Sequence, residues 1–258
     1  MKIKGMTKKP IGSFHGLKAE IIYHQAIGES TDTFALHLPE PRTLLSTRQG
    51  FMKAKIIFNC HIPKALGDYM HDQTKEQKKL YYEMLSDVLK EYRLGINDFA
   101  FLSTAVTMDK IAWAEETYED LWVMAFTTAG VKNNAMRIGR DKAGGIERNG
   151  QFIRLGTINT ILVTNASFDQ AAQASAIIAA TEAKNVALQE LDIRSAFNRD
   201  WLATGTGTDQ VIVISGDGEK CTYVQGHTKI GEIMARAVIR STTEAIRNCA
   251  GSAMPDNK

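Results

Sequence analysis

Hydroxyl and amide side chains interrupt an otherwise apolar segment at residues 156–166, which reads GTINTILVTNA. Thr157 follows a glycine at the start of this segment, where its hydroxyl can project into a cleft and act as a nucleophile. Threonine is also an ordinary strand residue, so the sequence leaves both interpretations open. Asn159, Thr164 and Asn165 add polar groups that need hydrogen bonds if they are buried. The segment therefore offers a nucleophile together with groups that could bind an amide.

A second polar cluster, TGTGTD at residues 204–209, precedes another apolar run. Phosphate-binding loops connect a strand to the helix that follows it, so this cluster does not indicate a nucleotide site. Small hydroxyl groups and backbone N–H groups suit an oxyanion or a substrate amide, and a tight turn is the alternative. Gly205, Thr206, Thr208 and Asp209 are therefore candidates for the same site.

A third candidate region lies at the end of the apolar run 121–130, which closes with Thr128 and Gly130. A glycine at this point lets backbone N–H groups approach a ligand closely. Asn133 and Asn134 follow at once and add amide groups. Paired asparagines are also common in turns, so a plain turn is the competing interpretation.

The titratable residues outside these regions give weaker signals. None of the six histidines shows the spacing of zinc ligands, so the sequence does not support a metal-dependent hydrolase. His61 and His227 lie at the expected ends of elements, where an imidazole can reach a cleft. Glu182 and Lys184 are two residues apart in a predicted helix, so at most one of them faces the sheet.

Strands and helices must position these groups, and the periodicity of apolar residues predicts both. The first part of the chain is rich in strands, and the last hundred residues alternate strand, helix, strand and helix. This order predicts an α/β fold with mixed, largely antiparallel sheets layered with outer helices, an αββα-like sandwich. Ser167 is the expected N-cap of the central helix. The predicted strands cover 19–27, 33–38, 53–63, 99–106, 121–130 and 156–166, a loop runs into a strand over 204–216, an acidic turn covers 115–120, and helices cover 72–95, 167–193 and 227–249.

Composition excludes several classes of protein. The 258 residues include 44% hydrophobic residues, which predicts a compact globule. This length allows one large domain or two small ones, and we expect one domain over 1–258 with a polar tail at 250–258. Basic residues exceed acidic ones by two (31 − 29) and are scattered, so a nucleic-acid partner is not expected. The sequence has neither a signal peptide nor an apolar run of about 18 residues, so we expect a cytoplasmic protein without a membrane partner. Cys60, Cys221 and Cys249 are far apart, which predicts reduced thiols rather than disulfides or zinc.

Five blocks in order together resemble the adenosylcobinamide amidohydrolase family: TTAGVKNNAMRIG, GTINTILVTNA, TEAK, TGTGTD and GHTKIGE. The best-matching core is 99–245, while LLST at 44–47 and IIFNCHIP at 56–63 resemble the front part of the family. Residues 48–50 are Arg-Gln-Gly where the family pattern has paired glycines. The resemblance implies hydrolysis of the amide that joins the aminopropanol arm to the corrin ring of adenosylcobinamide. The products would be adenosylcobyric acid and the amino alcohol, in corrinoid (vitamin B12) salvage, with the cobalt corrinoid as substrate and no cofactor or metal besides.

A second resemblance concerns the mechanism. The segment GTINTILVTNASF, followed by a helix and a glycine-rich loop, is similar to the nucleophile region of self-processing aminopeptidases and ornithine acetyltransferases. It implies that Thr157 is the nucleophile and that the turn at 128–130 supplies oxyanion donors. Thr208 and Asp209 would occupy the polar positions that enter the later strand.

The general base stays open at this point. In the self-processing enzymes the chain is cut before the nucleophile, and the new amino group is the base. In an uncut chain His227, Glu182 or Lys184 would have to serve. The expected catalytic residues are therefore Thr157, Thr208, Asp209, His227 and Glu182, and the expected substrate-binding or oxyanion residues are Thr128, Gly130, Asn133, Asn134, Asn159, Asn165, Gly205, Thr206 and Lys229.

Two other functions compete with this one. A non-catalytic corrinoid-binding protein would bind the ligand without releasing aminopropanol. An amidase with the same scaffold would act on a peptide or acyl-amino acid and need no corrinoid. A corrin is wide and flat, so Trp113, Trp122 or Trp201 could line its slot, with core packing as the alternative. The sequence leaves open the preferred corrinoid, the need for the adenosyl group, and assembly into a homo-oligomer.

Overall fold

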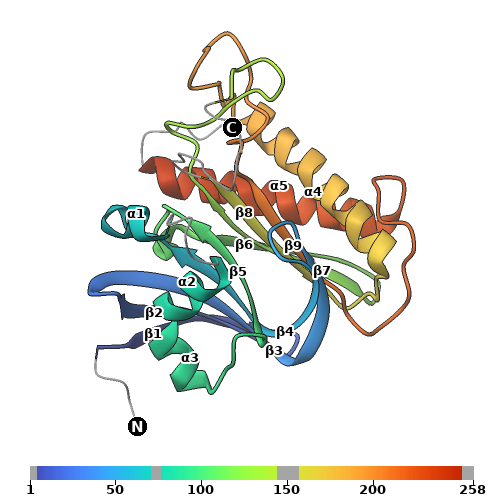
Figure 1. Ribbon diagram of the computed structural model, residues 1–258. Helices are drawn as coiled ribbons and strands as arrows, with labels where there is room; N and C mark the ends of the chain where they lie inside the picture. Colours follow the sequence, from blue (N-terminus) through green and yellow to red (C-terminus); the bar gives the residue numbers. More distant parts are fainter. Residues whose placement is uncertain (1–4, 71–76, 144–156, 252–258) are drawn as a thin grey trace. The chain divides into compact units, whose positions relative to one another are not determined.

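The computed structural model describes residues 5–70, 77–143 and 157–251 (Figure 1). Within it the chain divides into two compact units. Unit 1 contains the described residues of Met1–Pro41, Lys53–Asp109 and Ala143–Arg154. Unit 2 contains those of Arg42–Met52, Lys110–Lys142 and Leu155–Lys258. A single domain over the whole chain stays a prediction.

Unit 1 is built on strands with short helices beside them. Its strands pair as an antiparallel meander, β1 with β2 and β2 with β3, while β4 pairs with β3 and, in parallel, with β5. Strands β3 and β4 extend into unit 2 at the turn that joins them. The elements are β1 (Thr7–Phe14), β2 (Leu17–Ala26), β3 (Glu29–Ser46), β4 (Gly50–His61), the 3₁₀ turn Lys64–Leu66, α1 (Gly67–Met70), α2 (Gln77–Met84), α3 (Ser86–Tyr92), β5 (Phe99–Thr104) and the 3₁₀ turn Met108–Lys110.

The predicted helix at 72–95 is present as two helices. α2 and α3 meet at Leu85, whose φ of −93° and ψ of 7° interrupt the regular helix. Residues 71–76 lie outside the described residues. The apolar residues of this segment lie on one buried face, because Leu80, Met84, Val88 and Leu89 pack in one cluster with side chains of β2, β4 and β5.

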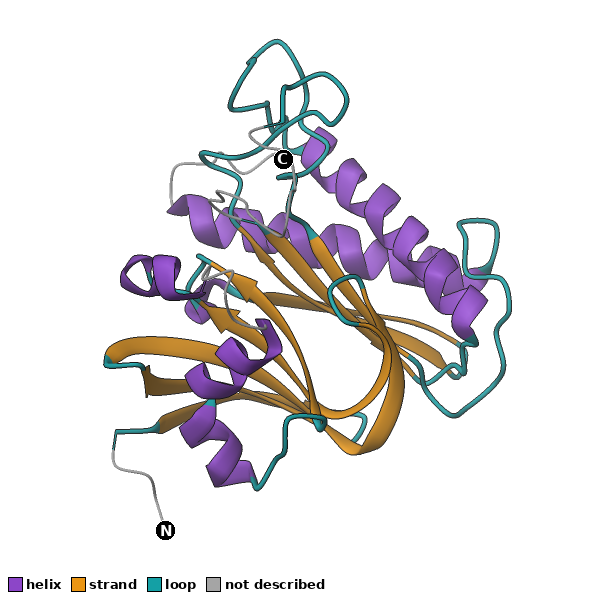
Figure 2. Cartoon of the chain, viewed as in Figure 1, coloured by secondary structure: helices purple, strands orange, loops and turns teal. Residues whose placement is uncertain are grey.

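Unit 2 contains a sheet with two long helices on one face (Figures 1 and 2). The last residues of β3 pair with β9, and the order continues through β8 and β7 to β6. β8 and β9 are parallel, and the other pairs of this unit are antiparallel. The elements are β6 (Ala112–Tyr118), β7 (Leu121–Ala129), β8 (Ile158–Thr164), α4 (Gln170–Glu190), β9 (Gln210–Ile214) and α5 (Lys229–Ala250).

Alanines let α4 lie close to the sheet. Ala172, Ala176, Ala180 and Ala183 all point into the core that α4 shares with α5 and strands β7 to β9. Small side chains permit this close packing, as the alanine content of the segment predicts. The prediction of a mixed, largely antiparallel α/β fold with outer helices is confirmed.

Two local predictions need correction. Within the acidic segment 115–120 only Glu119 and Asp120 form the turn, because residues up to Tyr118 continue β6 and pair with β7. β6 ends the order of paired strands in this unit, so its polar side chains can reach water and need not alternate cleanly with apolar ones. The N-cap of α4 is Asp169 rather than Ser167, since the Asp169 carboxylate accepts a hydrogen bond from the backbone N–H of Ala172. No described helix is both long enough and apolar enough to span a bilayer.

Candidate active site

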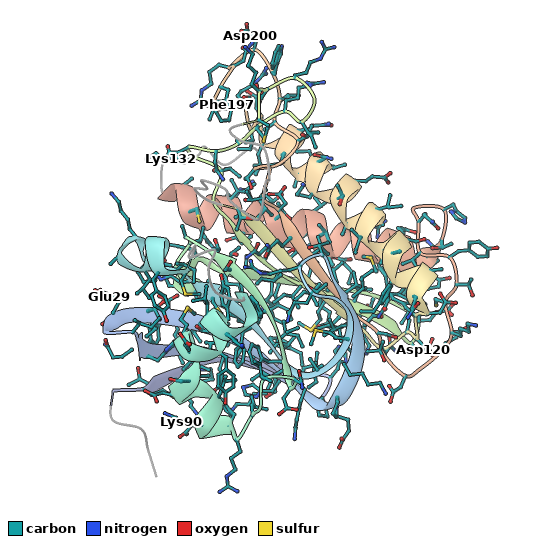
Figure 3. All side chains as sticks on the ribbon, viewed as in Figure 1. Glu29, Lys90, Asp120, Lys132, Phe197 and Asp200 are labelled. Atoms are coloured by element: carbon teal, nitrogen blue, oxygen red, sulfur yellow. The ribbon has the colours of Figure 1, made fainter. Side chains whose placement is uncertain are left out.

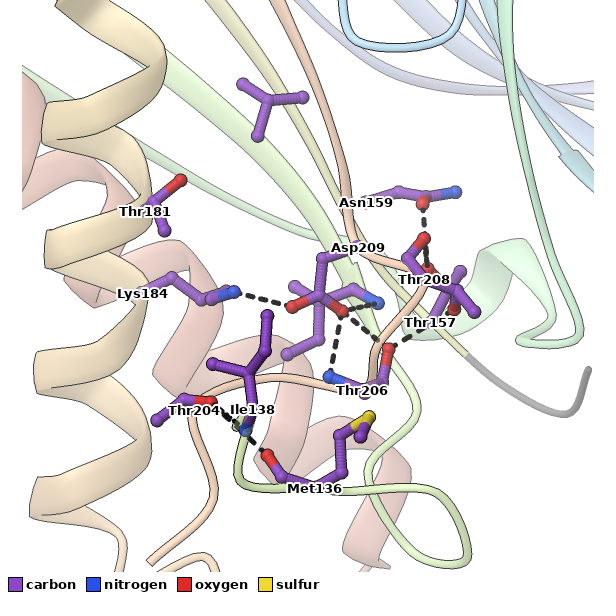
Figure 4. A network of polar contacts seen from close by, with 12 residues as sticks. Met136, Ile138, Thr157, Asn159, Thr181, Lys184, Thr204, Thr206, Thr208 and Asp209 are labelled. Carbon is purple, nitrogen blue, oxygen red and sulfur yellow. Dashed lines mark hydrogen bonds and ion pairs between the residues drawn. The ribbon is translucent and has the colours of Figure 1, made fainter. Parts of the chain in front are cut away.

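A polar network at the start of β8 and β9 centres on Asp209 (Figure 4). Because the two strands are parallel neighbours, the residues before each strand meet at one edge of the sheet. Oδ1 of Asp209 accepts hydrogen bonds from the backbone N–H of Ile158 at 3.2 Å and of Thr206 at 3.1 Å. It also accepts one from Oγ1 of Thr206 at 2.5 Å, while Nζ of Lys184 lies 2.5 Å from Oδ2.

Burial makes this network strong. The side chains of Lys184 and Asp209 are only 11% and 16% exposed, so their attraction is weakly screened by water. A buried carboxylate is stable only if its charge is paired and its oxygens are hydrogen-bonded, and four donors meet that condition here. With both oxygens hydrogen-bonded, Asp209 anchors β8 and the loop before β9.

Thr157 lies directly beside this anchor. Its hydroxyl donates to the backbone carbonyl of Thr208 at 2.7 Å and lies 3.4 Å from Oδ1 of Asn159. The residue retains 5% of its surface exposed. The predicted meeting of residue 157 with the 204–209 loop is therefore confirmed. Gly156 lies outside the described residues.

Glycine is required at two points of the loop. A Cβ atom on Gly205 would lie 2.2 Å from Oδ2 of Asp209 and 2.9 Å from Nζ of Lys184. A Cβ on Gly207 would lie 2.4 Å from Sδ of Met136, and the φ of this glycine is +75°. Only glycine allows the loop to pass this close to the Lys184–Asp209 pair and to Met136.

The turn after β7 is joined to the same loop. The backbone N–H of Met136 donates to the carbonyl of Gly205 at 2.8 Å, and the N–H of Thr204 donates to the carbonyl of Met136 at 2.8 Å. The two glycine-bearing turns therefore converge, as the sequence predicts. Asn133 is exposed in this turn, and Asn134 is partly buried.

The donors near Gly130 differ from the prediction. The Gly130 N–H donates to the carbonyl of Thr157 at 3.0 Å, so this amide is not available as an oxyanion donor. Thr128 is fully buried and pairs with Asn159 across β7 and β8. Nδ2 of Asn134, by contrast, is a buried donor without a hydrogen-bond partner among the described residues. It is the group of this turn that lacks an acceptor.

Three predicted site residues lie at the other end of the sheet. Asn165 follows β8, where its side chain accepts from the N–H of Trp122 and donates to the carbonyl of Asp120. β8 separates the two residues, and eight residue steps at about 3.3 Å each place Asn165 about 26 Å from Thr157. Lys229 contacts Glu232 at 2.8 Å and lies 5.0 Å from the ring of Tyr118. Tyr118 pairs with Leu121 at the same end of the sheet as Asn165. The exposed His227 lies two residues before Lys229. Asn165, His227 and Lys229 are therefore outside the network.

Helix α4 contributes one residue to the site. Glu182 is exposed, whereas Lys184 reaches Asp209, so the prediction that at most one of them faces the sheet is confirmed. In the sequence Lys184 is only a candidate base, and its pairing with Asp209 is not predicted. A signal was present, because the residues four before it and three and four after it, Ala180, Ala187 and Leu188, are all apolar and buried.

The remaining predicted groups are structural or lie elsewhere. His61 belongs to unit 1, where its Nδ1 lies 3.3 Å from Oδ2 of Asp32. Trp122 is buried, Trp113 is 44% exposed and Trp201 is half-buried. Among the described residues no group of three His, Cys, Asp or Glu side chains could hold a metal ion.

Comparison with known proteins identifies the family. The family model for adenosylcobinamide amidohydrolase matches residues 18–253. The chain belongs to this family. An adenosylcobinamide amidohydrolase from Methanosarcina mazei is 30% identical over 201 residues, which is 74% of this chain and 82% of the relative. An uncharacterised protein from Methanocaldococcus jannaschii is 41% identical over 229 residues, covering 84% of this chain and 87% of the relative. The adenosylcobinamide amidohydrolases are hydrolases that act on carbon–nitrogen amide bonds, so the resemblance and the prediction of an amidohydrolase are confirmed.

Similarity to solved structures is weaker. A protein from Pyrococcus horikoshii aligns over 96% of this chain and 84% of its own length, with a TM-score of 0.42 and 12% identity. This similarity is too low to support a statement about the site.

Proposed function

We propose that this chain hydrolyses the amide between the corrin ring and the aminopropanol arm of adenosylcobinamide, in corrinoid salvage or remodelling. Membership of the adenosylcobinamide amidohydrolase family supports the reaction class, and the name of the Methanosarcina mazei relative supports the substrate. The observation that supports the proposed site is the position of the Thr157 hydroxyl, which donates to the Thr208 carbonyl at 2.7 Å beside the Asp209 network. The products are adenosylcobyric acid and the free amino alcohol. A cytoplasmic location and assembly with further copies of the chain stay predictions.

Thr157 acts as the nucleophile in this proposal. Its Oγ1 forms a bond to the carbonyl carbon of the substrate amide, and the carbon–nitrogen bond then breaks. The hydroxyl proton ends on the departing amine, which leaves an ester between the corrinoid acid and Thr157. Water cleaves the ester and restores the hydroxyl. The carbonyl of Thr208 orients the hydroxyl but does not act as a base, because a backbone carbonyl is not basic.

Asp209 and Lys184 act as positioning residues. Asp209 holds the N–H of Ile158, the residue next to Thr157, and the N–H and hydroxyl of Thr206. Lys184 balances the charge of this carboxylate at 2.5 Å. Fixing a nucleophile within a fraction of an ångström contributes much of the rate of such reactions, so a displaced Thr157 would be a poor catalyst.

Asn134 is the proposed donor to the oxyanion. Its buried Nδ2 has no acceptor among the described residues, and its turn is hydrogen-bonded to the 204–209 loop through Met136. An uncompensated buried donor costs stability, which is recovered if a substrate oxygen accepts from it. Removal of one oxyanion donor typically lowers kcat by about 10²- to 10³-fold.

The test compares two buried threonines at the two ends of β8, Thr157 just before the strand and Thr164 as its last residue. Thr157 donates to the carbonyl of Thr208 at 2.7 Å, and Thr164 donates to the carbonyl of Trp122 at 2.6 Å. Thr157→Ala and Thr164→Ala therefore remove similar hydrogen bonds at opposite ends of one strand. The rate of adenosylcobyric acid formation, measured by chromatography, should fall at least about 10³-fold in Thr157→Ala and change little in Thr164→Ala.

Other outcomes separate the alternatives. A folded Thr157→Ala variant with full activity would show that the nucleophile is another group. A wild-type protein that binds adenosylcobinamide but releases no amino alcohol would be a corrinoid-binding protein. Release of acid from peptides or acyl-amino acids, but not from the corrinoid, would assign a different amidase activity.

A further inference from the structure

Two large apolar side chains of unit 2 are strongly exposed on loops. Ile138 is 77% exposed and Phe197 is 66% exposed. Burial of apolar surface stabilises a fold by about 25 cal/mol per Å², so neither side chain contributes its share to folding. Single exposed apolar residues are common on protein surfaces. Here the two side chains lie on loops that are hydrogen-bonded to each other.

Hydrogen bonds fix the loop that carries Phe197. The N–H of Ala196 donates to the carbonyl of Ala135 at 2.7 Å, which joins this loop to the turn after β7. The hydroxyl of Ser195 donates to Asp141 at 2.7 Å and accepts from the N–H of Phe197 at 3.0 Å. Figure 3 shows Phe197 on this loop, which follows α4 in the chain. The exposed ring is therefore presented on a bonded framework.

Ile138 is connected directly to the candidate active site. Its N–H donates to Oγ1 of Thr204 at 3.0 Å, and Thr204 is followed by Gly205, which passes within contact distance of the Lys184–Asp209 pair (Figure 4). The N–H of Met136 also bonds to the Gly205 carbonyl at 2.8 Å. The loop that holds Asp209 in place thus also holds Ile138 at the surface.

The substrate proposed above has a shape that needs such a surface. A corrin is a flat macrocycle with methyl groups and amide arms at its edge, and the amide to be cut lies on one of these arms. When that amide is at Thr157, the ring must rest on neighbouring surface. Ligand sites of this kind combine apolar walls with a few polar groups that set orientation.

We propose that Ile138 and Phe197 form an apolar surface that binds the corrin ring and sets specificity for corrinoids over smaller amides. This inference rests on the proposed function. The polar network supplies chemistry at the amide, and the two apolar side chains contact the ring. Small acyl amides do not extend to this surface and gain nothing from it.

The experiment uses three exposed side chains of unit 2. Ile138→Ser and Phe197→Ser should each raise KM for adenosylcobinamide about tenfold and leave kcat within about twofold, because they remove ground-state and transition-state contacts alike. Tyr223→Ser is the matched control, because Tyr223 is 67% exposed and its ring lies 6.1 Å from that of His227, at the far end of the sheet. This control should change neither constant. All three variants should keep the wild-type unfolding midpoint.

Binding separates this inference from the proposed function. In the Thr157→Ala background, quenching of protein fluorescence by adenosylcobinamide gives a dissociation constant without turnover. If the wild type forms no product, the proposed reaction is wrong, yet weaker binding caused by Ile138→Ser would still support the surface. Unchanged KM and unchanged binding in both loop variants would overturn the inference, as would an absence of any corrinoid binding by the wild type.

A different occupant has its own signature. If Phe197→Ser or Ile138→Ser lowers the mass in solution measured by light scattering, the surface is an interface between copies of this chain. That result would overturn the assignment to the corrin ring.

Discussion

The ammonium group of Lys184 lies 2.5 Å from Oδ2 of Asp209, and this contact ties the second half of α4 to the start of β9. The other oxygen of Asp209 holds the N–H of Ile158 and the backbone and side chain of Thr206. One carboxylate therefore joins a helix, the first residue of β8 and the loop before β9. The position of the Thr157 hydroxyl depends on this junction.

Breaking the pair should cost stability and activity together. Asp209→Asn leaves the ammonium of Lys184 buried without a counter-charge, and removal of one partner of a buried pair typically costs about 3–5 kcal/mol. Lys184→Met should cost less, because three donors still face the Asp209 carboxylate. Urea unfolding of both single variants and the double variant gives the coupling energy.

Glu182→Ala is the control for this measurement, since Glu182 lies exposed on the same helix. It should change the free energy of unfolding by less than about 0.5 kcal/mol. Equal losses of unfolding free energy in Glu182→Ala and Lys184→Met would mean that the buried Lys184–Asp209 pair does not stabilise the fold.

Gly205 should tolerate no side chain. In Gly205→Ala the new methyl group would lie 2.2 Å from Oδ2 of Asp209, so the loop or the ion pair must move. Overpacking of this kind costs about 1–3 kcal/mol, and the displaced loop should also reduce turnover. Circular dichroism melts and the amidohydrolase assay check the two effects.

Gly226→Ala is the matched substitution, because no heavy atom lies within 4 Å of a Cβ at that glycine. It should leave both stability and turnover unchanged. A Gly205→Ala variant as stable and active as Gly226→Ala would show that the loop moves without cost.

The meeting of Thr157 with the 204–209 loop could be predicted from the sequence. Both segments precede strongly apolar runs, and the helix between them predicts a parallel crossover that brings the two strand starts to one edge. The glycines of the loop permit the close approach that Gly205 makes at the Lys184–Asp209 pair, although the sequence suggested such an approach only at Gly130.

The sequence did not predict which polar residues lie at the same end of the sheet as Thr157. Asn165 is as polar as Asn159 and belongs to the same segment, yet it binds Trp122 and Asp120 in a turn at the opposite end. His227 and Lys229 precede and begin α5, so their distance from Thr157 depends on the direction in which that helix crosses the sheet. Local sequence patterns do not specify this direction, whereas the structure shows it.

A buried carboxylate in unit 1 gives a prediction about pH. Glu20 of β2 is 2% exposed, and its Oε1 accepts hydrogen bonds from His37 at 2.8 Å and from the hydroxyl of Tyr92. Lys18 lies 3.4 Å from the other oxygen. Burial raises the pKa of Glu20, but the hydrogen bonds from His37 and Tyr92 and the charges of His37 and Lys18 outweigh it and lower the pKa from 4.5 to about 2.

Glu20 therefore stabilises the fold in a defined pH range. Since its pKa is lower in the folded state, the unfolded chain binds more protons between pH 4.5 and 2, and stability rises with pH across this window. The contribution is complete above about pH 5 and is lost as the pH falls towards 2. Urea unfolding at pH 6 and pH 3 should show a large difference between wild type and Glu20→Gln at the higher pH and a smaller one at the lower.

Tyr92→Phe tests the cause of this effect. The substitution removes one hydrogen bond to the charged carboxylate, so the pKa of Glu20 should rise towards its usual value and its stabilising effect at pH 6 should shrink. The stability of Tyr92→Phe should consequently fall less than that of the wild type between pH 6 and pH 3. If the free energy of unfolding falls equally in wild type, Glu20→Gln and Tyr92→Phe between pH 6 and pH 3, acid destabilises the fold through groups other than Glu20.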